Sequence, residues 1–328
     1  MSASLEPEVR CLNNRFSWRL FLGFFLLLVV IGLNSWLLFY YKLPGKNFFW
    51  SALHNSGHDL VFLGLAFLLS LILHYFVVNR KLTRAAAYSL VLSLVFGAAV
   101  ELLQAQVGRE ASWDDFRLDA AGSLAGVCVY LAIYWCHWRR YVAIVLCILL
   151  LGISLIEPIK WRLAEEYRED AFPVLADFDN DWLNLYVRPA YQASLSFVAA
   201  PAKWKGNNTV VAKLALRPAP WPGLHLAEVE RDWRGYKTFS FEVFNPQSEP
   251  VKLVTRVHDR SHNNKHNDRF NRTYTLAPGY QKIEIPIAKI MSAPKGRDMR
   301  MDRVRAVMFY SYKLQEEQIL YFDNIRLF

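Results

Sequence analysis

The residues best suited to chemistry lie between Glu101 and Gly126, where ionisable side chains separate two strongly apolar runs. Ionisable groups at a membrane boundary are costly, so they are usually paired, hydrated or functional. Residues three or four apart are neighbours on a helix, which pairs Glu101 with Gln104 and Asp115 with Asp119. Together with a histidine that starts another apolar run, they form a candidate catalytic cluster: His58, Glu101, Gln104, Arg109, Asp115 and Asp119.

This cluster has two interpretations. In the first, Arg109 holds an anionic group through paired hydrogen bonds, and Glu101 or His58 transfers a proton. In the second, the arginine and carboxylate side chains pair with one another, fix the helix ends and order the loop outside the membrane. The residue types allow both interpretations, and only the first makes the protein an enzyme.

Five apolar runs position these side chains, at about 20–41, 60–78, 85–106, 118–136 and 141–157. About twenty apolar residues cross a bilayer as a helix. The first run is longer than the apolar core of a signal peptide and lacks a small-residue cleavage site, which indicates a retained anchor. Gly122 and Gly126 are four residues apart, a spacing that lets two membrane helices approach closely. Residues 1–159 are therefore predicted to form a bundle of five transmembrane helices.

The basic residues of the loops predict the orientation of this bundle. Lys and Arg are concentrated before the first run, between the second and third, and between the fourth and fifth: Arg10, Arg15, Arg19, Arg80, Lys81, Arg84, Arg139 and Arg140. Positive loop residues favour the cytoplasmic side of a membrane. We therefore expect a cytoplasmic N-terminus, with the polar stretch and everything after the fifth run outside.

The second half of the chain has a different pattern of apolar and polar residues. After a short helix or linker at 160–171, residues 172–328 show short alternating apolar runs, such as 209–216, 237–244 and 304–312, separated by Pro, Gly and Asn. This pattern predicts an all-β antiparallel sandwich. Residues 160–328 hold 26 Lys and Arg against 20 Asp and Glu, and the basic residues form no run, which argues against nucleic-acid binding. A basic surface facing acidic glycans or lipid head groups is allowed.

The polar stretch also carries a family resemblance. Glu101, Gln104, Arg109, Ser112, Asp115, Asp119, Gly122 and Gly126, with His58 upstream, resemble the signature of VanZ-like membrane proteins over about residues 20–140. The family usually has Asn where this chain has Asp119. The resemblance implies a link to the bacterial cell envelope, with the bundle in the inner membrane and the second half in the periplasm. It supplies no settled reaction.

The second half resembles jelly-roll, galactose-binding-like modules of the carbohydrate-binding type. The matching segments are 232–236, 241–246, 257–259, 269–271, 278–280 and 321–327. In such modules sugars lie on the concave sheet or in edge loops, against aromatic rings and polar side chains. The resemblance implies these candidate glycan contacts: Trp204, Trp221, Trp233, Tyr236 and Arg269. Each aromatic residue has the alternative of a place in the sandwich core, where aromatic side chains dominate.

The residue types allow two candidate metal sites. Asp259 and Asp323 are candidate ligands of a structural Ca²⁺, which prefers carboxylate and carbonyl oxygens, and a plain hydrogen-bonded Asp at a strand end is the alternative. His258, His262 and His266 recur every four residues and would face a zinc ion on a helix. Their segment is predicted to be a polar loop, and in a loop a spacing of four residues does not place side chains on one face.

These observations support three hypotheses. The first is an inner-membrane envelope protein whose periplasmic sandwich recognises an exported polysaccharide or a peptidoglycan-related polymer. The second is a membrane-embedded enzyme acting on a lipid-linked substrate through the outer polar cluster. The third is a scaffold whose sandwich binds another protein.

Overall fold

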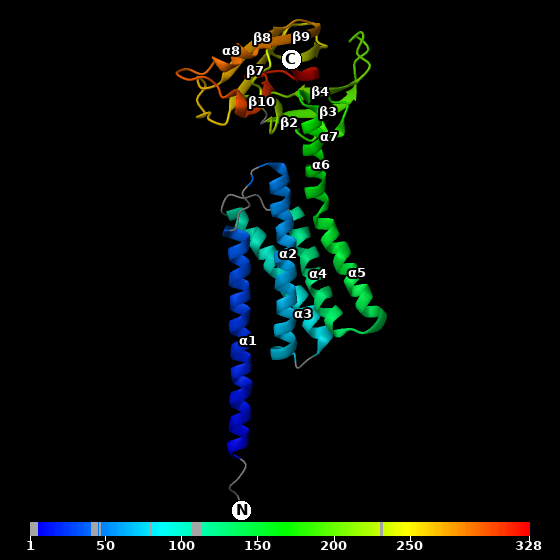
Figure 1. Ribbon diagram of the computed structural model, residues 1–328, viewed down its shortest axis with the longest axis vertical. Helices are drawn as coiled ribbons and strands as arrows, with labels where there is room; N and C mark the ends of the chain where they lie inside the picture. The colour runs from blue at the N-terminus through cyan, green and yellow to red at the C-terminus, as the bar shows by residue number, and fades with distance from the viewer. Residues whose placement is uncertain (1–5, 41–44, 46, 79–80, 107–112, 230–231) are drawn as a thin grey trace, which may run out of the picture. The chain divides into compact units, whose positions relative to one another are not determined.

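The computed structural model describes residues 6–40, 45, 47–78, 81–106, 113–229 and 232–328. The chain divides into two compact units, a helical unit, Met1–Arg162, and a strand-bearing unit, Leu163–Phe328 (Figure 1). Helix α6, Ile156–Ala171, contains the boundary. It occupies the segment for which the sequence predicts a short helix or a linker.

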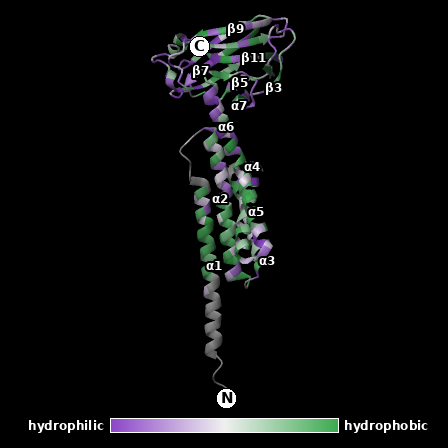
Figure 2. Cartoon of the chain, turned by 45° about the vertical axis from the view of Figure 1, so that its right-hand side comes forward, coloured by the Kyte–Doolittle hydropathy of each residue, from purple (hydrophilic) through white to green (hydrophobic). Residues whose placement is uncertain are grey.

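The helical unit consists of long helices that are mostly apolar (Figure 2). Their bounds are α1 Glu6–Tyr40, α2 Phe48–Ile72, α3 Leu82–Gln106, α4 Trp113–Tyr134 and α5 His137–Ser154, with a π-helical turn at Leu73–Val77. Among the described residues, four stretches are long and apolar enough to cross a membrane: Phe48–Val77, Leu82–Leu103, Trp113–Tyr134 and His137–Ser154. In α1 the apolar stretch, Phe21–Leu37, is shorter, so four candidate spans stand where the sequence predicts five.

Helix α2 begins earlier than the apolar run that predicts it. Asn47 caps the helix, and its side-chain oxygen accepts a hydrogen bond from the backbone N–H of Trp50 at 3.0 Å. The run starts at residue 60 because the first turns of α2 carry polar residues, His54 and His58 among them. Both histidines therefore lie inside the helix, before the apolar run begins.

Helices α2 and α4 are in close contact at the two glycines singled out by their spacing. A Cβ atom on Gly122 would lie 2.2 Å from the backbone oxygen of Asp59, and one on Gly126 would lie 2.3 Å from that of Leu63. Neither distance leaves room for a side chain. The prediction that Gly122 and Gly126 allow close helix packing is confirmed, and the partner helix is α2.

The strand-bearing unit contains two antiparallel sheets. Sheet A has the order β3-β4-β11-β6-β9, with β1 paired to β11, and sheet B has the order β2-β5-β10-β7-β8. The strands are β1 Val174–Ala176, β2 Val187–Ala190, β3 Ala193–Ala199, β4 Val210–Leu216, β5 Gly223–Leu226, β6 Thr238–Asn245, β7 Val251–Asp259, β8 Phe270–Leu276, β9 Gly279–Pro286, β10 Val304–Tyr310 and β11 Gln318–Leu327. Most consecutive strands fall in different sheets, as in a jelly roll.

The core of the sandwich is built from side chains that alternate along the strands. Phe241 on β6 and Phe322 on β11 come from sheet A, and Phe309 on β10 comes from sheet B. The ring of Phe309 lies 4.7 Å from that of Phe241 and 5.2 Å from that of Phe322, so the two sheets interdigitate. Because side chains of a strand alternate between faces, the neighbours of these residues point outward and form the outer surfaces.

Candidate functional sites

The helical unit buries a polar cluster between α2 and α4. The imidazole Nδ1 of His58 lies 3.4 Å from a carboxylate oxygen of Asp119, and the two side chains are 7% and 1% exposed. Gly97 on α3 packs against this pair, because a Cβ atom there would lie 3.3 Å from Asp119 Oδ2. A buried histidine and carboxylate in contact can hold or transfer a proton.

Asp59 belongs to this cluster, although the sequence analysis did not single it out. Its side chain is fully buried on α2, beside Gly122, and its polar neighbours include Ser154 on α5 and Asp119 on α4. Neither oxygen of Asp59 has a hydrogen-bond partner of good geometry among the described residues. A signal was available, because Asp59 is the only acidic residue between Phe48 and Val77.

The other predicted members of the cluster have mixed outcomes. Glu101 is buried on α3, one turn after Gly97, and Asp115 is half-buried on α4, one turn before Asp119. The side chain of Gln104 and the whole of Arg109 lie outside the described residues. The structure therefore brings His58 and Asp119 together and adds Asp59.

A mostly apolar cavity of about 570 Å³ lies beside this cluster. His54, Ser56, His58 and Ser154 supply its polar lining. The remaining lining residues are Leu37, Leu53, Gly57, Leu60, Val61, Leu151 and Leu155. Apolar walls with a few convergent polar groups are typical of a binding cavity for a hydrophobic molecule.

The strand-bearing unit presents a second candidate site on the outer face of sheet B. Val257 on β7 and Phe309 on β10 point into the core, so Arg256, Met308 and Tyr310 point outward. The strand register places Met308 opposite both Arg256 and a histidine of β5. We call this surface the basic face, and define it by His225, Arg256, His258, Arg269, Asn271 and Tyr310.

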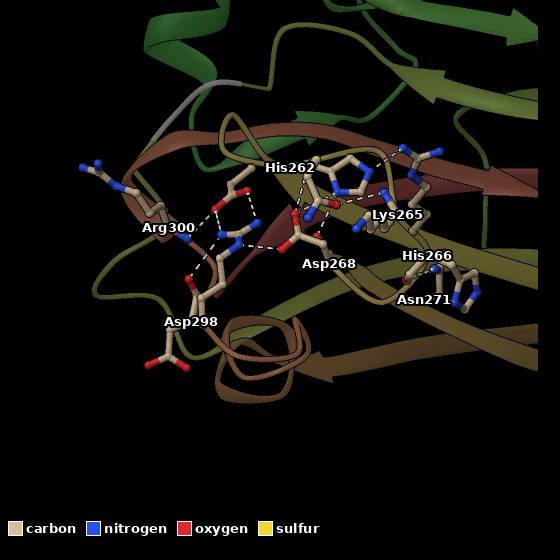
Figure 3. A network of polar contacts seen from close by, with 11 residues as sticks. His262, Lys265, His266, Asp268, Asn271, Asp298 and Arg300 are labelled. Atoms are coloured by element: carbon tan, nitrogen blue, oxygen red, sulfur yellow. Dashed lines mark hydrogen bonds and ion pairs between the residues drawn. The ribbon is translucent and has the colours of Figure 1, made fainter.

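The loop after β7 folds back beside the basic face. The ring of His262 lies 4.8 Å from that of His258, and its Nε2 is 3.4 Å from an Nη atom of Arg256. The other ring nitrogen, Nδ1, lies 2.9 Å from the backbone oxygen of Asp268 (Figure 3). The loop therefore holds the His262 ring against His258 and Arg256, at the edge of the basic face.

A buried ion-pair network anchors this loop. The Arg297 guanidinium contacts Asp259 and Asp268, each at 2.6 Å, and Asp259 also accepts a hydrogen bond from the backbone N–H of Arg300 (Figure 3). Hydrogen bonds from Arg297 lower the pKa of Asp268 to about 2. Burial raises the pKa of Asp259, but the hydrogen bonds from Arg297 and Arg300 outweigh it and leave that pKa below its ordinary value.

The pKa shifts on the basic face have a different cause from those in the Arg297 ion-pair network, because burial dominates them. Burial and the neighbouring Arg256 lower the pKa of His225. Burial, then Arg256 and His262, lower the pKa of His258 to about 3. Burial, then the charge of Arg269, lowers the pKa of Arg256. The two arginines therefore carry the charge at neutral pH, while His225 and His258 are neutral.

Two exposed aromatic rings lie close to this face. Tyr191 is 63% exposed and Trp221 is 44% exposed, and their ring centroids are 5.6 Å apart at 64°. Tyr191 is within electrostatic range of Arg256. The hydroxyl of Tyr310 lies 3.4 Å from the side-chain oxygen of Asn271. The site thus combines ring surfaces, hydrogen-bonding groups and positive charge.

The structure separates the predicted glycan contacts. Trp221 is exposed, and Arg269 is on the basic face. Trp204 and Trp233 are 3% and 0% exposed, and both pack against other aromatic rings: Trp204 stacks on Phe244, and Trp233 stacks on Phe239. Tyr236 is half-buried and packs edge-on against Phe172.

The candidate metal ligands have other partners. Asp259 is paired with Arg297, and Asp323 on β11 accepts hydrogen bonds from Asn207 and Thr209, so the two carboxylates lie in different sheets and different networks. A Ca²⁺ ion at Asp259 would have to displace a guanidinium. Across the described residues, no group of three or more His, Cys, Asp or Glu side chains is arranged to hold a metal ion.

Comparison with known proteins gives a likeness in fold. No protein family and no curated protein matches the sequence. The β-sandwich resembles the family 11 carbohydrate-binding module of Clostridium thermocellum in complex with a mixed-linked tetrasaccharide, at 18% identity over 47% of this chain and 93% of that chain, with a TM-score of 0.35. The same family's module from the cellulase Lic26A-Cel5E matches at 16% identity over 43% and 85%, with a TM-score of 0.31.

An exo-β-agarase also matches, at 14% identity over 47% of this chain, with a TM-score of 0.38. The match spans one quarter of the agarase chain. At these identities the likeness concerns the fold. The resemblance of the helical unit to VanZ-like proteins rests on its motif residues alone.

Proposed function

We propose that the protein is anchored by its helical unit in a bacterial inner membrane and binds a saccharide on the outer face of sheet B, in the periplasm. The observation that carries this proposal is the basic face with its neighbouring rings, Tyr191 and Trp221. Sugar rings present C–H surfaces that pack on aromatic rings, and their hydroxyls need donors and acceptors nearby. The basic face offers Tyr310, Asn271 and two neutral histidines for this purpose.

The outer face of sheet A is a poorer candidate. Lys282 and Glu284 pair with each other there at 2.7 Å, so these two charges are already compensated. Trp204, Val211 and Phe244 form a small apolar cluster of their own there. A surface whose polar groups are already satisfied gains little from a polar ligand.

The experiment is a binding titration with the full-length protein in phosphatidylcholine nanodiscs against a panel of neutral and acidic polysaccharides and peptidoglycan fragments. The variant carries Tyr191→Ala and Trp221→Ala together. The matched control is Tyr280→Ala, which removes a ring of 48% exposure on sheet A. We expect saturable binding that the double variant loses and the control keeps. A panel that shows no binding to the folded protein refutes the proposal.

A second candidate function is favoured by the cavity of the helical unit. His58 lines the cavity and contacts the buried Asp119, so a proton-transferring pair meets an apolar binding space. This arrangement suits an enzyme that acts on a lipid-linked envelope substrate, with the apolar chain in the cavity. Asp119→Asn should then trap the bound lipid while the protein stays folded.

The cavity offers a matched pair of variants. Gly57 lines it and Gly64 does not, although both lie on α2 with no heavy atom within 4 Å of an added Cβ. Gly57→Leu fills the cavity, and Gly64→Leu adds the same side chain elsewhere. Mass spectrometry of co-purified lipid should show loss with Gly57→Leu only. Equal lipid content in both variants would remove this candidate.

A further inference from the structure

Among the described residues, Arg256 and Arg269 have none of the carboxylate partners that buried arginines normally have. Both side chains are half-buried, and the Nε atom of each is enclosed without a hydrogen-bond partner in the part of the chain that the structure describes. Among the described residues, neither makes an ion pair, and the one polar contact of Arg256 is with a ring nitrogen of His262. A guanidinium removed from water without a carboxylate is unfavourable unless another anion compensates it.

The carboxylates at the end of β7 and in the loop that follows it cannot supply that compensation. Asp259 and Asp268 are at the end of β7 and in the loop beside it, and both are held by Arg297 at 2.6 Å. Each engages a different part of the guanidinium, so neither is available without breaking a buried pair. The fold therefore builds one balanced arginine beside two that are not balanced.

We infer that the basic face takes an anionic saccharide, whose carboxylate, sulfate or phosphate group is held between Arg256 and Arg269. This inference rests on the proposed saccharide-binding function and names the ligand class. A planar guanidinium donates two parallel hydrogen bonds to such a group, and two guanidiniums close together are repelled until an anion lies between them. The strand register places Arg256 opposite Asn271, two residues from Arg269, and burial and then the charge of Arg269 lower the pKa of Arg256.

The surroundings favour a sugar as the carrier of the anion. Tyr191 is within electrostatic range of Arg256 and packs edge-on against Trp221, so an anionic group at the arginines places its sugar ring near these two rings. The hydroxyl of Tyr310 lies 3.4 Å from the side-chain oxygen of Asn271, and the strand register places Asn271 opposite Arg256. A bare inorganic anion would use only the guanidiniums.

The test compares ligands that differ only in charge. Full-length protein in phosphatidylcholine nanodiscs is titrated with oligogalacturonate, with its methyl ester, and with dextran sulfate against dextran. Inorganic sulfate and phosphate form a third arm. We expect the acidic saccharides to bind, and Arg256→Ala with Arg269→Ala to weaken that binding by at least about tenfold. Arg256→Lys should recover part of it, because it keeps the charge and loses the fork.

The control variant is Arg272→Ala, which removes an exposed arginine of β8, the strand paired to β7, that contacts Tyr274 instead. It should bind acidic saccharides as the unaltered protein does. Equal loss with Arg272→Ala would mean that any positive charge serves, which overturns the inference. Equal affinity for the acid and its ester, still dependent on Tyr191 and Trp221, would overturn it and leave the saccharide-binding proposal intact.

Two other outcomes also overturn the inference. Binding of inorganic anions as tight as that of acidic saccharides would make the basic face an anion site rather than a saccharide site. Binding to phosphatidylglycerol vesicles that depends on both arginines, without binding to any saccharide, would assign the face to a lipid surface and refute the saccharide-binding proposal as well.

Discussion

At one end of sheet B, Arg297 lies beside a pair of arginines, Arg256 and Arg269. The single arginine and the pair differ in how their charge is compensated. Arg297 has two carboxylate partners, Asp259 and Asp268, whose side chains are 0% and 6% exposed. Arg256 and Arg269 have none among the described residues. His262 touches both groups, with one ring nitrogen toward Asp268 and the other toward Arg256.

The difference separates a structural role from a binding role. A buried arginine that satisfies two buried acids stabilises the fold, because its removal leaves charges that the protein cannot solvate. An arginine that lacks an anion contributes little to the fold and gains its partner only from a ligand. Stability and ligand binding should therefore respond to different arginines of the same site.

The largest effect is expected from Arg297→Ala. It leaves Asp259 and Asp268 buried without their counter-charge, so the strand-bearing unit should lose about 3 kcal/mol of stability. Hydrogen exchange measured peptide by peptide on the full-length protein would show faster exchange over 251–310, with the helical peptides as internal reference. Arg297→Lys keeps one contact and should lie between. Unchanged exchange would mean that this network is not an anchor.

An effect of intermediate size is expected from pH. His258 has its pKa lowered to about 3 by burial, then by Arg256, His262, His225 and Arg269. The unfolded chain, with an ordinary histidine pKa of 6.5, binds a proton that the folded chain refuses. Stability should therefore fall as the pH drops below about 6.5, toward pH 3. The carboxylates held by Arg297 keep their charge through the upper part of this window, because their pKa values are lowered.

His258→Asn tests this assignment, because it removes the titrating group and keeps a polar side chain of similar reach. Denaturation at a series of pH values should show a smaller loss between pH 6.5 and 4 in the variant than in the unaltered protein. Identical slopes for the two proteins would place the pH dependence elsewhere.

Much of the fold was predictable because its signals are local. Apolar runs indicated the spans, alternation indicated the sandwich, and the spacing of Gly122 and Gly126 indicated a tight helix contact. The sequence predicted five spans and the structure has four candidate spans among the described residues. The difference comes from the first apolar run, which looked long enough to cross a membrane, whereas the described apolar part of α1 is shorter.

The sites were less predictable because they depend on which strands and helices meet. Arg256 and His225 are thirty-one positions apart and become neighbours only through the register of β5, β10 and β7. Residue type also misleads about exposure, since Trp221 is accessible and Trp233 is fully buried. Asp59 was not predicted because it is a single carboxylate beside a long apolar run. Its complete burial is nevertheless what makes it a candidate site residue.

A smaller effect, of opposite sign, is expected from Arg256→Ala. The change removes a half-buried positive charge and its repulsion with Arg269. The free energy of unfolding should therefore rise by up to about 1 kcal/mol or stay unchanged. The same hydrogen-exchange measurement applies. A loss as large as that of Arg297→Ala would erase the distinction between the two groups and make Arg256 part of the anchor.

The smallest effect is expected from Lys282→Ala, which sharpens the comparison by holding distance constant. Lys282 lies 2.7 Å from Glu284, nearly the distance of Arg297 from its acids, but the two side chains are 42% and 56% exposed. Water solvates each charge of such a pair and salt screens their attraction, so its removal should change stability very little. Exchange over 279–286 is the measurement. A cost that approached that of Arg297→Ala would show that contact distance, rather than burial, decides what an ion pair contributes in this sandwich.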